Sequence, residues 1–199
     1  DKHVTGVQTC ALPIYKLKVY HSKKIILYIA NLEERKKPFI FLKIAEKLQK
    51  KLNGEAIFIM LGAKRDNKLF SRILEFIKKR NYIFYLGFKK NISDYIYASD
   101  LFIAPYKDEP FGRTLIESML LQTLVLASNS GAHGEIIIDR ANGFLFKENN
   151  INRISQLAFN ILRNKNKMRK IVKTAYQTSL SNYPISQHVK KVNQLYNEL

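Results

Sequence analysis

Short apolar runs of strand length alternate along this chain with longer segments whose apolar residues recur every three or four positions. The short runs predict six strands, at residues 25–30, 56–62, 83–86, 101–104, 124–128 and 144–146. The longer segments predict helices at residues 39–52, 69–79, 152–162 and 167–179. Such alternation is typical of a parallel sheet with connecting helices on both faces. We therefore predict an α/β fold in which residues 15–199 form one domain, a length that supports a core of its own.

The strand predicted at 101–104 leads into the segment EPFGRTLIE. Pro105 ends that strand because proline cannot donate to a central ladder, and a helix begins at Arg113 or Thr114. In a parallel sheet this loop lies at the carboxyl edge, where doubly wound folds bind ligands. We expect Gly112 to let the backbone approach a ligand closely, while the N–H groups of the first helical turn carry a charge of about +0.5. Phosphate is the ligand that such a turn favours.

Two carboxylates, Glu109 and Glu117, bracket this turn eight positions apart. Glu117 falls near the helix start, within reach of a sugar hydroxyl bound at the same end. Each hydrogen bond from a hydroxyl to a carboxylate contributes roughly 1.5–3 kcal/mol, which suits a ribose diol. Either glutamate alone would also fit a solvated charge or a helix-start preference. The pair together with the Phe-Gly turn favours a binding site.

EPFGRTLIE resembles the EX7E signature of retaining glycosyltransferases of family 4, also called group 1. The preceding run YLGFKKNISDYIYASDLFIAPYKD and the later runs VLASNSGAHGEII and ANGFLF are similar to neighbouring segments of that family, with Ala132 in place of a second glycine. The likeness covers about residues 24–199. It implies a single Rossmann-like domain, the C-terminal, donor-binding half of a two-domain GT-B fold.

The resemblance also implies roles for individual residues. Glu109 would orient the transferred sugar, Lys36 would contact the donor diphosphate, and Glu117 would hold the ribose. Asn31 stands where the family usually has an arginine, although a cation about 4 Å from a phosphate contributes on the order of 4 kcal/mol at an effective dielectric near 20. We predict that Arg113 compensates for that missing charge. The complete implied donor site consists of Asn31, Lys36, Gly87, Phe88, Glu109, Phe111, Gly112, Arg113, Thr114 and Glu117.

The implied reaction is transfer of a hexosyl group from a nucleotide-diphosphate sugar to an unknown acceptor, with retention, in bacterial polysaccharide or glycolipid biosynthesis. The alternatives are a nucleotide-sugar-binding fragment without turnover, or a basic nucleic-acid-binding domain. No cofactor or metal is expected, since no His, Asp and Glu cluster has metal-ligand spacing and no P-loop is present. His133, in the SGAHGE run, is expected to be an ordinary loop residue, with a contact to the donor as the alternative.

The chain carries 34 Lys and Arg against 16 Asp and Glu, a formal net charge of +18. The cations are scattered and belong to no recognised nucleic-acid module, so we expect no nucleic-acid partner. Lys, Ile and Asn are all abundant, so a bias toward AT-rich coding explains the charge more simply than a partner does. An anionic membrane surface is a second contribution, because each cation near such a surface contributes about 1 kcal/mol. We therefore expect a cytoplasmic protein, peripheral at the inner face of the membrane, with a sugar or lipid-linked acceptor bound by a missing N-terminal domain.

The two ends of the chain differ from its middle. The run VTGVQTCALPI resembles the translation of a sequencing-library adapter, so residues 1–14 are expected to be a non-native scar that replaces upstream sequence. A genuine apolar arm is the alternative. The only cysteine, Cys10, lies in this run, which leaves no disulfide framework. Residues 186–199 predict a last helix with one apolar stripe, made of Val189, Val192, Tyr196 and Leu199.

Overall fold

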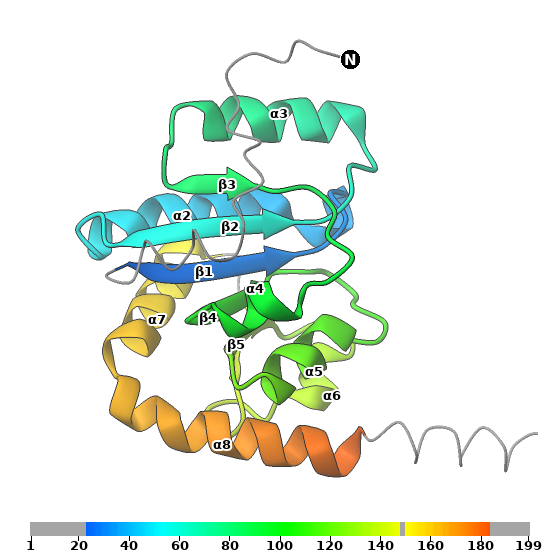
Figure 1. The fold of residues 1–199 in the computed structure, drawn as a ribbon, viewed down its shortest axis with the longest axis vertical. Helices are drawn as coiled ribbons and strands as arrows, with labels where there is room; N and C mark the ends of the chain where they lie inside the picture. Colours follow the sequence, from blue (N-terminus) through cyan, green and yellow to red (C-terminus); the bar gives the residue numbers. More distant parts are fainter. Residues whose placement is uncertain (1–22, 148–149, 184–199) are drawn as a thin grey trace, which may run out of the picture.

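The computed structural model describes residues 23–147 and 150–183 and shows six parallel strands in one sheet (Figure 1). The strand order is β3-β2-β1-β4-β5-β6, the order of a doubly wound dinucleotide-binding fold. The strands are β1 (Lys24–Ile29), β2 (Ala56–Leu61), β3 (Ile83–Tyr85), β4 (Leu101–Ala104), β5 (Leu124–Ser128) and β6 (Phe144–Phe146). All six strand predictions are confirmed, with bounds that differ by one residue at most.

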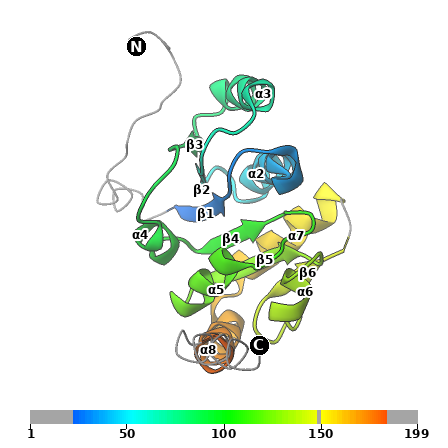
Figure 2. The ribbon, with the colours of Figure 1, turned by 90° about the vertical axis from the view of Figure 1, so that its right-hand side faces the viewer.

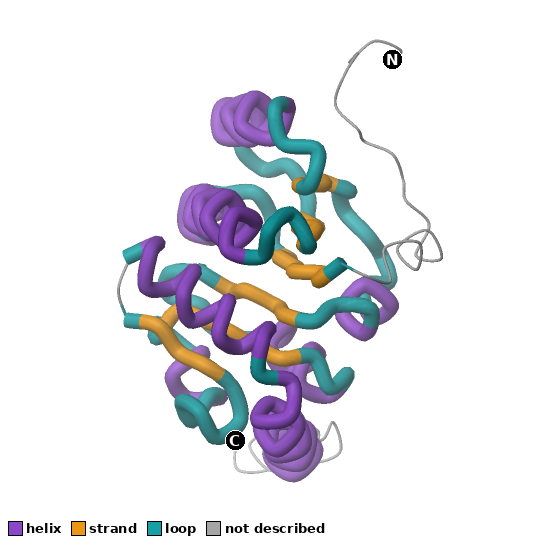
Figure 3. The backbone as a smooth tube through the Cα atoms, turned by 90° about the vertical axis from the view of Figure 1, so that its left-hand side faces the viewer, coloured by secondary structure: helices purple, strands orange, loops and turns teal. Residues whose placement is uncertain are grey.

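Helices cover both faces of this sheet, as the sequence predicts. In Figure 2, α2 and α7 lie on one face and α4 and α5 on the other, and Figure 3 shows the strands flanked by helices from the opposite side. The helices are η2 (Glu34–Lys36), α2 (Pro38–Lys51), α3 (Asn67–Lys78), α4 (Ser93–Tyr97), α5 (Arg113–Leu120), α6 (His133–Ile136), α7 (Ile151–Arg163) and α8 (Lys165–Asn182). Within the described residues, no helix is long and apolar enough to cross a bilayer.

Local chemistry explains where these elements begin. The strands of the sheet centre are apolar on both faces, because helices bury them on both sides, and all six residues of β2 are buried. Pro38 occupies the first turn of α2, where its missing N–H costs nothing. Asp66 and Asn150 begin α3 and α7 by accepting hydrogen bonds from backbone N–H groups three residues later, at 2.9 and 3.2 Å.

Two predictions lie outside the described residues. One is the non-native scar at residues 1–14, and the other is the last helix at residues 186–199. The structure therefore leaves both as predictions.

Gly62 sets how closely the loops after β1 and β2 can approach each other. Its φ is +146°, and a Cβ atom there would lie 1.8 Å from the carbonyl oxygen of Ala30. Beyond this contact, the N–H of Ala63 donates to Asn31 Oδ1 at 3.3 Å, which fixes the start of the loop that carries Lys36. A side chain at position 62 would thus push apart the two loops that begin the carboxyl edge of the sheet.

We predict that Gly62→Ala lowers the free energy of unfolding by about 3 kcal/mol, because the added methyl clashes with the backbone of Ala30. The matched control is Gly54→Ala, at φ +83° with no atom within 4 Å of the new Cβ. In that control only the left-handed backbone, which alanine disfavours, lowers the free energy of unfolding, by about 1–2 kcal/mol. Equilibrium urea unfolding measures both. Equal losses for the two variants would contradict the clash.

Candidate functional site

A pocket of about 1250 Å³ opens at the carboxyl ends of the strands. Its walls come from the segments that follow β1, β2, β3, β4 and β5, together with one side of α5. The strand order reverses between β1 and β4, and ligands of open α/β sheets bind in the crevice at that point. The pocket therefore lies where this fold binds ligands.

Most of the predicted site residues meet in this pocket. Gly87 and Gly112 belong to the adjoining backbone and do not line it; the other predicted residues line it, namely Asn31, Lys36, Phe88, Glu109, Phe111, Arg113, Thr114 and Glu117. The sequence analysis missed several lining residues, which are Tyr106, Lys89, Lys90, Glu135, Asn182 and Tyr183. A signal existed for three of them, since Tyr106, Lys89 and Lys90 closely follow strand ends at the same edge.

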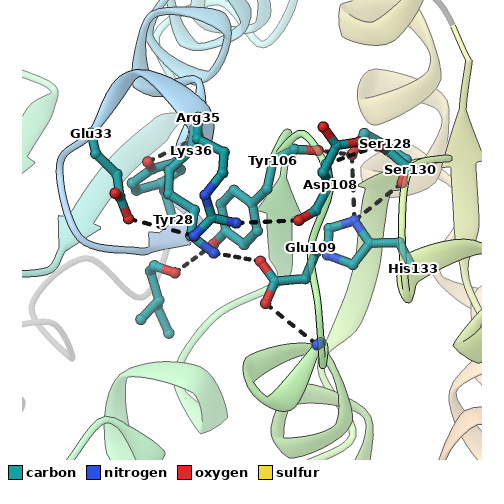
Figure 4. A network of polar contacts seen from close by, with 12 residues as sticks. Tyr28, Glu33, Arg35, Lys36, Tyr106, Asp108, Glu109, Ser128, Ser130 and His133 are labelled. Atoms are coloured by element: carbon teal, nitrogen blue, oxygen red, sulfur yellow. Dashed lines mark hydrogen bonds and ion pairs between the residues drawn. The ribbon is translucent and has the colours of Figure 1, made fainter.

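Lys36 and Glu109, which both line the pocket, form an ion pair with each other (Figure 4). Each side chain is only 12% exposed. The two residues come from the loops after β1 and β4, which are adjacent strands, and the N–H of Lys107 donates to the carbonyl of Arg35 at 2.9 Å between those loops. The sheet thus brings together two charges that are 73 residues apart in sequence.

The pKa of Glu109 reflects this partner. Burial alone would raise it, but the hydrogen bond and charge of Lys36, helped by the N–H of Gly112 at 3.4 Å, lower it below the usual value. Glu109 is therefore ionised at neutral pH.

The backbone of Glu109 is held by the loop after β5. The N–H of Ala132 donates to the carbonyl of Glu109 at 2.8 Å. Gly131, at φ +57°, packs so closely that a Cβ there would lie 2.4 Å from the same carbonyl oxygen. The first glycine of the SGAHGE run is thus required for the approach, whereas the position of Ala132 tolerates a side chain.

Gly112 precedes α5 at φ +63°, and no side chain caps the first turn of that helix. A Cβ at Gly112 would lie 2.5 Å from Ile136 Cδ1. We expected Gly112 to let the backbone approach a ligand, which stays a prediction; the structure adds a contact with the end of the Ile136 side chain, in α6. The glycine serves the left-handed turn and the packing of α6, while the first residues of α5, Arg113 and Thr114, line the pocket.

Glu117 has a buried oxygen with no partner. Its Oε2 atom is buried without a hydrogen bond, and its Oε1 atom lies 3.6 Å from Nε of Arg113. Burial raises the pKa of Glu117, and the charge of Arg113 only partly offsets that rise. Buried acceptors in native proteins are nearly always satisfied, so a hydroxyl donor is the ligand group that fits here.

His133 differs from its prediction. It begins α6 and is 1% exposed, so it is not an ordinary loop residue, and it does not line the pocket. Its Nδ1 atom donates to the carbonyl of Ser128 at 3.1 Å, which fixes the ring. Burial lowers the pKa of His133, with the Ser128 bond opposing the shift. His133 is therefore a neutral, buried packing residue at neutral pH.

Within the described residues, no group of three or more His, Cys, Asp and Glu side chains could hold a metal ion. The positive charge available to a ligand comes instead from pocket-lining residues, which are Lys36, Lys89, Lys90 and Arg113. The side chain of Arg113 is 85% exposed, whereas that of Lys36 is buried.

We predict a pH dependence of stability that comes from Glu109. Because the folded protein lowers the pKa of this carboxyl, its contribution is present above the unfolded pKa of about 4.5 and is lost as pH falls through the lower folded value. As the pH falls from roughly 5 to 2, protonation of Glu109 should lower the free energy of unfolding of the unaltered chain. Glu109→Gln should lack this contribution to the pH dependence. Chemical unfolding at several pH values measures it. Glu75→Gln, at an exposed position of α3, is the control and should keep the pH dependence of the unaltered chain.

Curated relatives of this chain include glycosyltransferases. An uncharacterised glycosyltransferase of Methanocaldococcus jannaschii is 28% identical over 138 residues, which cover 67% of this chain and 39% of that protein. The 2-deoxystreptamine N-acetyl-D-glucosaminyltransferase of Niallia circulans is 25% identical over 144 residues, which cover 71% of this chain and 37% of that protein. The chain thus spans about two fifths of the length of these relatives.

Solved structures share the fold. HepE of Anabaena, in complex with UDP and glucose, superposes with a TM-score of 0.86 at 19% identity over 94% of this chain and 52% of that one. The C-terminal domain of the group 1 glycosyl transferase LpcC of Francisella tularensis gives a TM-score of 0.73 at 24% identity over 81% of this chain and 87% of that one.

The likeness to these structures confirms the predicted Rossmann-like half of a GT-B fold. The family of group 1 glycosyl transferases matches residues 14–178, which include every strand and every predicted site residue. This chain therefore belongs to the group 1 family of glycosyl transferases.

Proposed function

We propose that this chain is the donor-binding half of a glycosyltransferase that transfers a hexosyl group from a nucleotide-diphosphate sugar, with retention, to an acceptor bound by another domain. The observation that carries the proposal is one pocket with three complementary features. These are a largely shielded ammonium at Lys36, an uncapped helix start at α5 and an unpaired buried oxygen of Glu117. Cation and helix start fit a diphosphate, and the unpaired oxygen fits a ribose hydroxyl.

In this proposal the diphosphate is the leaving group. Lys36 and the N–H groups of Arg113 and Thr114 stabilise the negative charge that grows on it as the bond to the sugar breaks. Glu109 lies beside Lys36 and orients the transferred sugar, and Glu117 holds the ribose. The lysine and the helix start supply positive charge, so the scheme has no step that uses a metal ion.

The base and the sugar are suggested by relatives alone. HepE binds UDP and glucose, and the Niallia circulans relative is an N-acetyl-D-glucosaminyltransferase. A UDP-sugar is therefore the first donor to test. The loop after β3 carries Phe88 and Lys89 into the pocket and is the proposed base-binding wall.

The binding of a sugar or lipid-linked acceptor and the contact with an anionic membrane surface stay predictions. Because the chain spans about two fifths of its curated relatives, transfer is proposed for the whole protein, and the present chain is expected to bind a donor without turnover. A peripheral contact with anionic lipid is proposed from the net charge of +18. Vesicle co-sedimentation that does not depend on anionic lipid would contradict that contact.

We predict that the chain binds one of UDP, GDP and ADP in preference to the other two, and that Glu117→Ala weakens this binding about tenfold or more. The reason is the loss of hydrogen bonds from ribose hydroxyls to the Glu117 carboxylate, each worth about 1.5–3 kcal/mol. Isothermal titration calorimetry measures the affinities.

Glu75→Ala is the matched control, because it removes an exposed glutamate of α3 that does not line the pocket. It should bind nucleotide like the unaltered chain. Binding of nucleic acid with no affinity for any of the three nucleotides would overturn the donor site in favour of a basic nucleic-acid-binding surface.

We further predict that Lys36→Ala and Arg113→Ala both weaken diphosphate binding, the first by more than tenfold and the second by about threefold. The Lys36 side chain is only 12% exposed, whereas that of Arg113 is 85% exposed and its charge is screened. Titration of the two variants at low and at 0.5 M salt separates them, since only the Arg113 contribution should fade with salt. An Arg113→Ala variant with unchanged affinity would disprove the compensation for Asn31.

A further inference from the structure

Tyr106 lies under the ammonium of Lys36 and is not part of the expected site. Nζ of Lys36 is 4.6 Å from the centroid of the Tyr106 ring. The ring is 1% exposed, yet one side of it lines the pocket. An ammonium at this distance from a tyrosine face is attracted by the electron-rich ring.

The Tyr106 ring is itself fixed from several directions. Its hydroxyl donates to the carbonyl oxygen of Ile29, at the end of β1. The ring packs edge-on against Tyr28, with centroids 5.7 Å apart, and at a tilt against His133, with centroids 5.6 Å apart. Tyr28 in turn donates to the carbonyl of Lys36 at 3.1 Å. The two tyrosines thus hold both ends of Lys36, its backbone and its ammonium.

The position of the Lys36 ammonium matters because it pairs with Glu109 and, in the proposed function, also contacts the donor diphosphate. In the free protein its ammonium pairs with Glu109, whereas a bound donor would bring diphosphate oxygens to one side and a sugar to the other. The Tyr106 ring lies beneath the ammonium and is buried, so a ligand that enters from the pocket cannot displace it. No arginine stands at position 31, where Asn31 instead accepts a hydrogen bond from the backbone of Ala63. Binding of the diphosphate therefore depends more on where the Lys36 ammonium is placed than it would with an arginine at position 31.

We propose that Tyr106 is a positioning residue that seats the ammonium of Lys36 on its ring face and keeps it aimed at the donor diphosphate. This inference rests on the proposed function, since it assumes that the pocket takes a nucleoside diphosphate. The hydroxyl of Tyr106 holds the ring in place, and the ring itself acts on Lys36.

The test changes the electronics of the ring and keeps its shape. Tyr106→Phe retains an electron-rich face, whereas replacement of Tyr106 by pentafluorophenylalanine reverses the polarity of that face at nearly the same volume. Two readouts are taken on the 199-residue chain. One is the NMR shift of the Lys36 ε-methylene protons without ligand, and the other is affinity for UDP, GDP and ADP by calorimetry. Each ring variant is also made in a Lys36→Ala background, and Phe58→Leu controls for the loss of a buried ring outside the pocket.

We expect upfield-shifted Lys36 protons in the unaltered chain and in Tyr106→Phe, and a loss of that shift with the fluorinated ring. We expect the fluorinated ring to weaken diphosphate binding about fivefold relative to Tyr106→Phe, with no difference between the two in the Lys36→Ala background. Phe58→Leu should lower thermal stability and leave affinity unchanged.

Equal affinities for the two ring variants would overturn the inference and leave the proposed function intact. The inference also fails if the fluorinated ring weakens binding equally without Lys36, because the ring would then act through shape. Absence of binding to all three nucleotides by the unaltered chain would overturn the proposed function, and this inference with it.

Discussion

The ion pair between Lys36 and Glu109 is the contact on which the pocket depends, because it joins the loops after β1 and β4 at the point where the strand order reverses. Taking two charges out of water costs several kcal/mol per ion, and their attraction offsets this only when geometry and further hydrogen bonds are good. For the charges themselves, the N–H of Gly112 donates to the second carboxylate oxygen of Glu109 at 3.4 Å, and the Tyr106 ring lies under the ammonium. The backbones of both residues are fixed as well. Tyr28 fixes the backbone of Lys36, and the loop at Gly131 and Ala132 fixes that of Glu109. The pair is therefore held by backbone contacts that a ligand does not need to break.

The ion pair between Lys36 and Glu109 also fixes the positions of two polar side chains that line the pocket. Both members are polar groups that the proposed reaction would need, one for the diphosphate and one for the sugar, and each satisfies the other until a ligand arrives. Glu117 has no such partner for its buried oxygen, so it is the group that gains most from a bound hydroxyl. The pocket thus combines one charge pair that is stable in the absence of ligand with one acceptor that is not satisfied without it.

The sequence predicts the parts of this molecule that local chemistry specifies. Apolar runs identify the strands, Pro105 ends β4 where expected, and the residues of EPFGRTLIE lie at the start of α5 around the pocket. What it misses depends on contacts between distant segments. His133 is buried because Ser128, at the end of β5, and Tyr106 contact its ring, and its helix of four residues is too short to give a periodic signal. Gly112 is favoured by the left-handed turn that the fold places before α5. In the sequence, Tyr106 resembles any aromatic residue of a loop, because its contact with the ammonium of Lys36 forms only in the folded chain.

Asn31 stands where the family usually has an arginine, and the structure gives its side chain a different partner. Its Oδ1 atom accepts the N–H of Ala63, so the side chain joins the loops after β1 and β2 and carries no charge to the pocket. Positive charge is left to the half-buried Lys36 and Lys89 and to the exposed Lys90 and Arg113. Exposed cations are screened within about 8–10 Å at ordinary ionic strength, and they attract any anion that approaches. In the proposed function, the Lys36 side chain, 12% exposed with its ammonium over the Tyr106 ring, is screened less than these exposed cations and directs the choice of ligand, while the exposed cations mainly raise the rate of encounter.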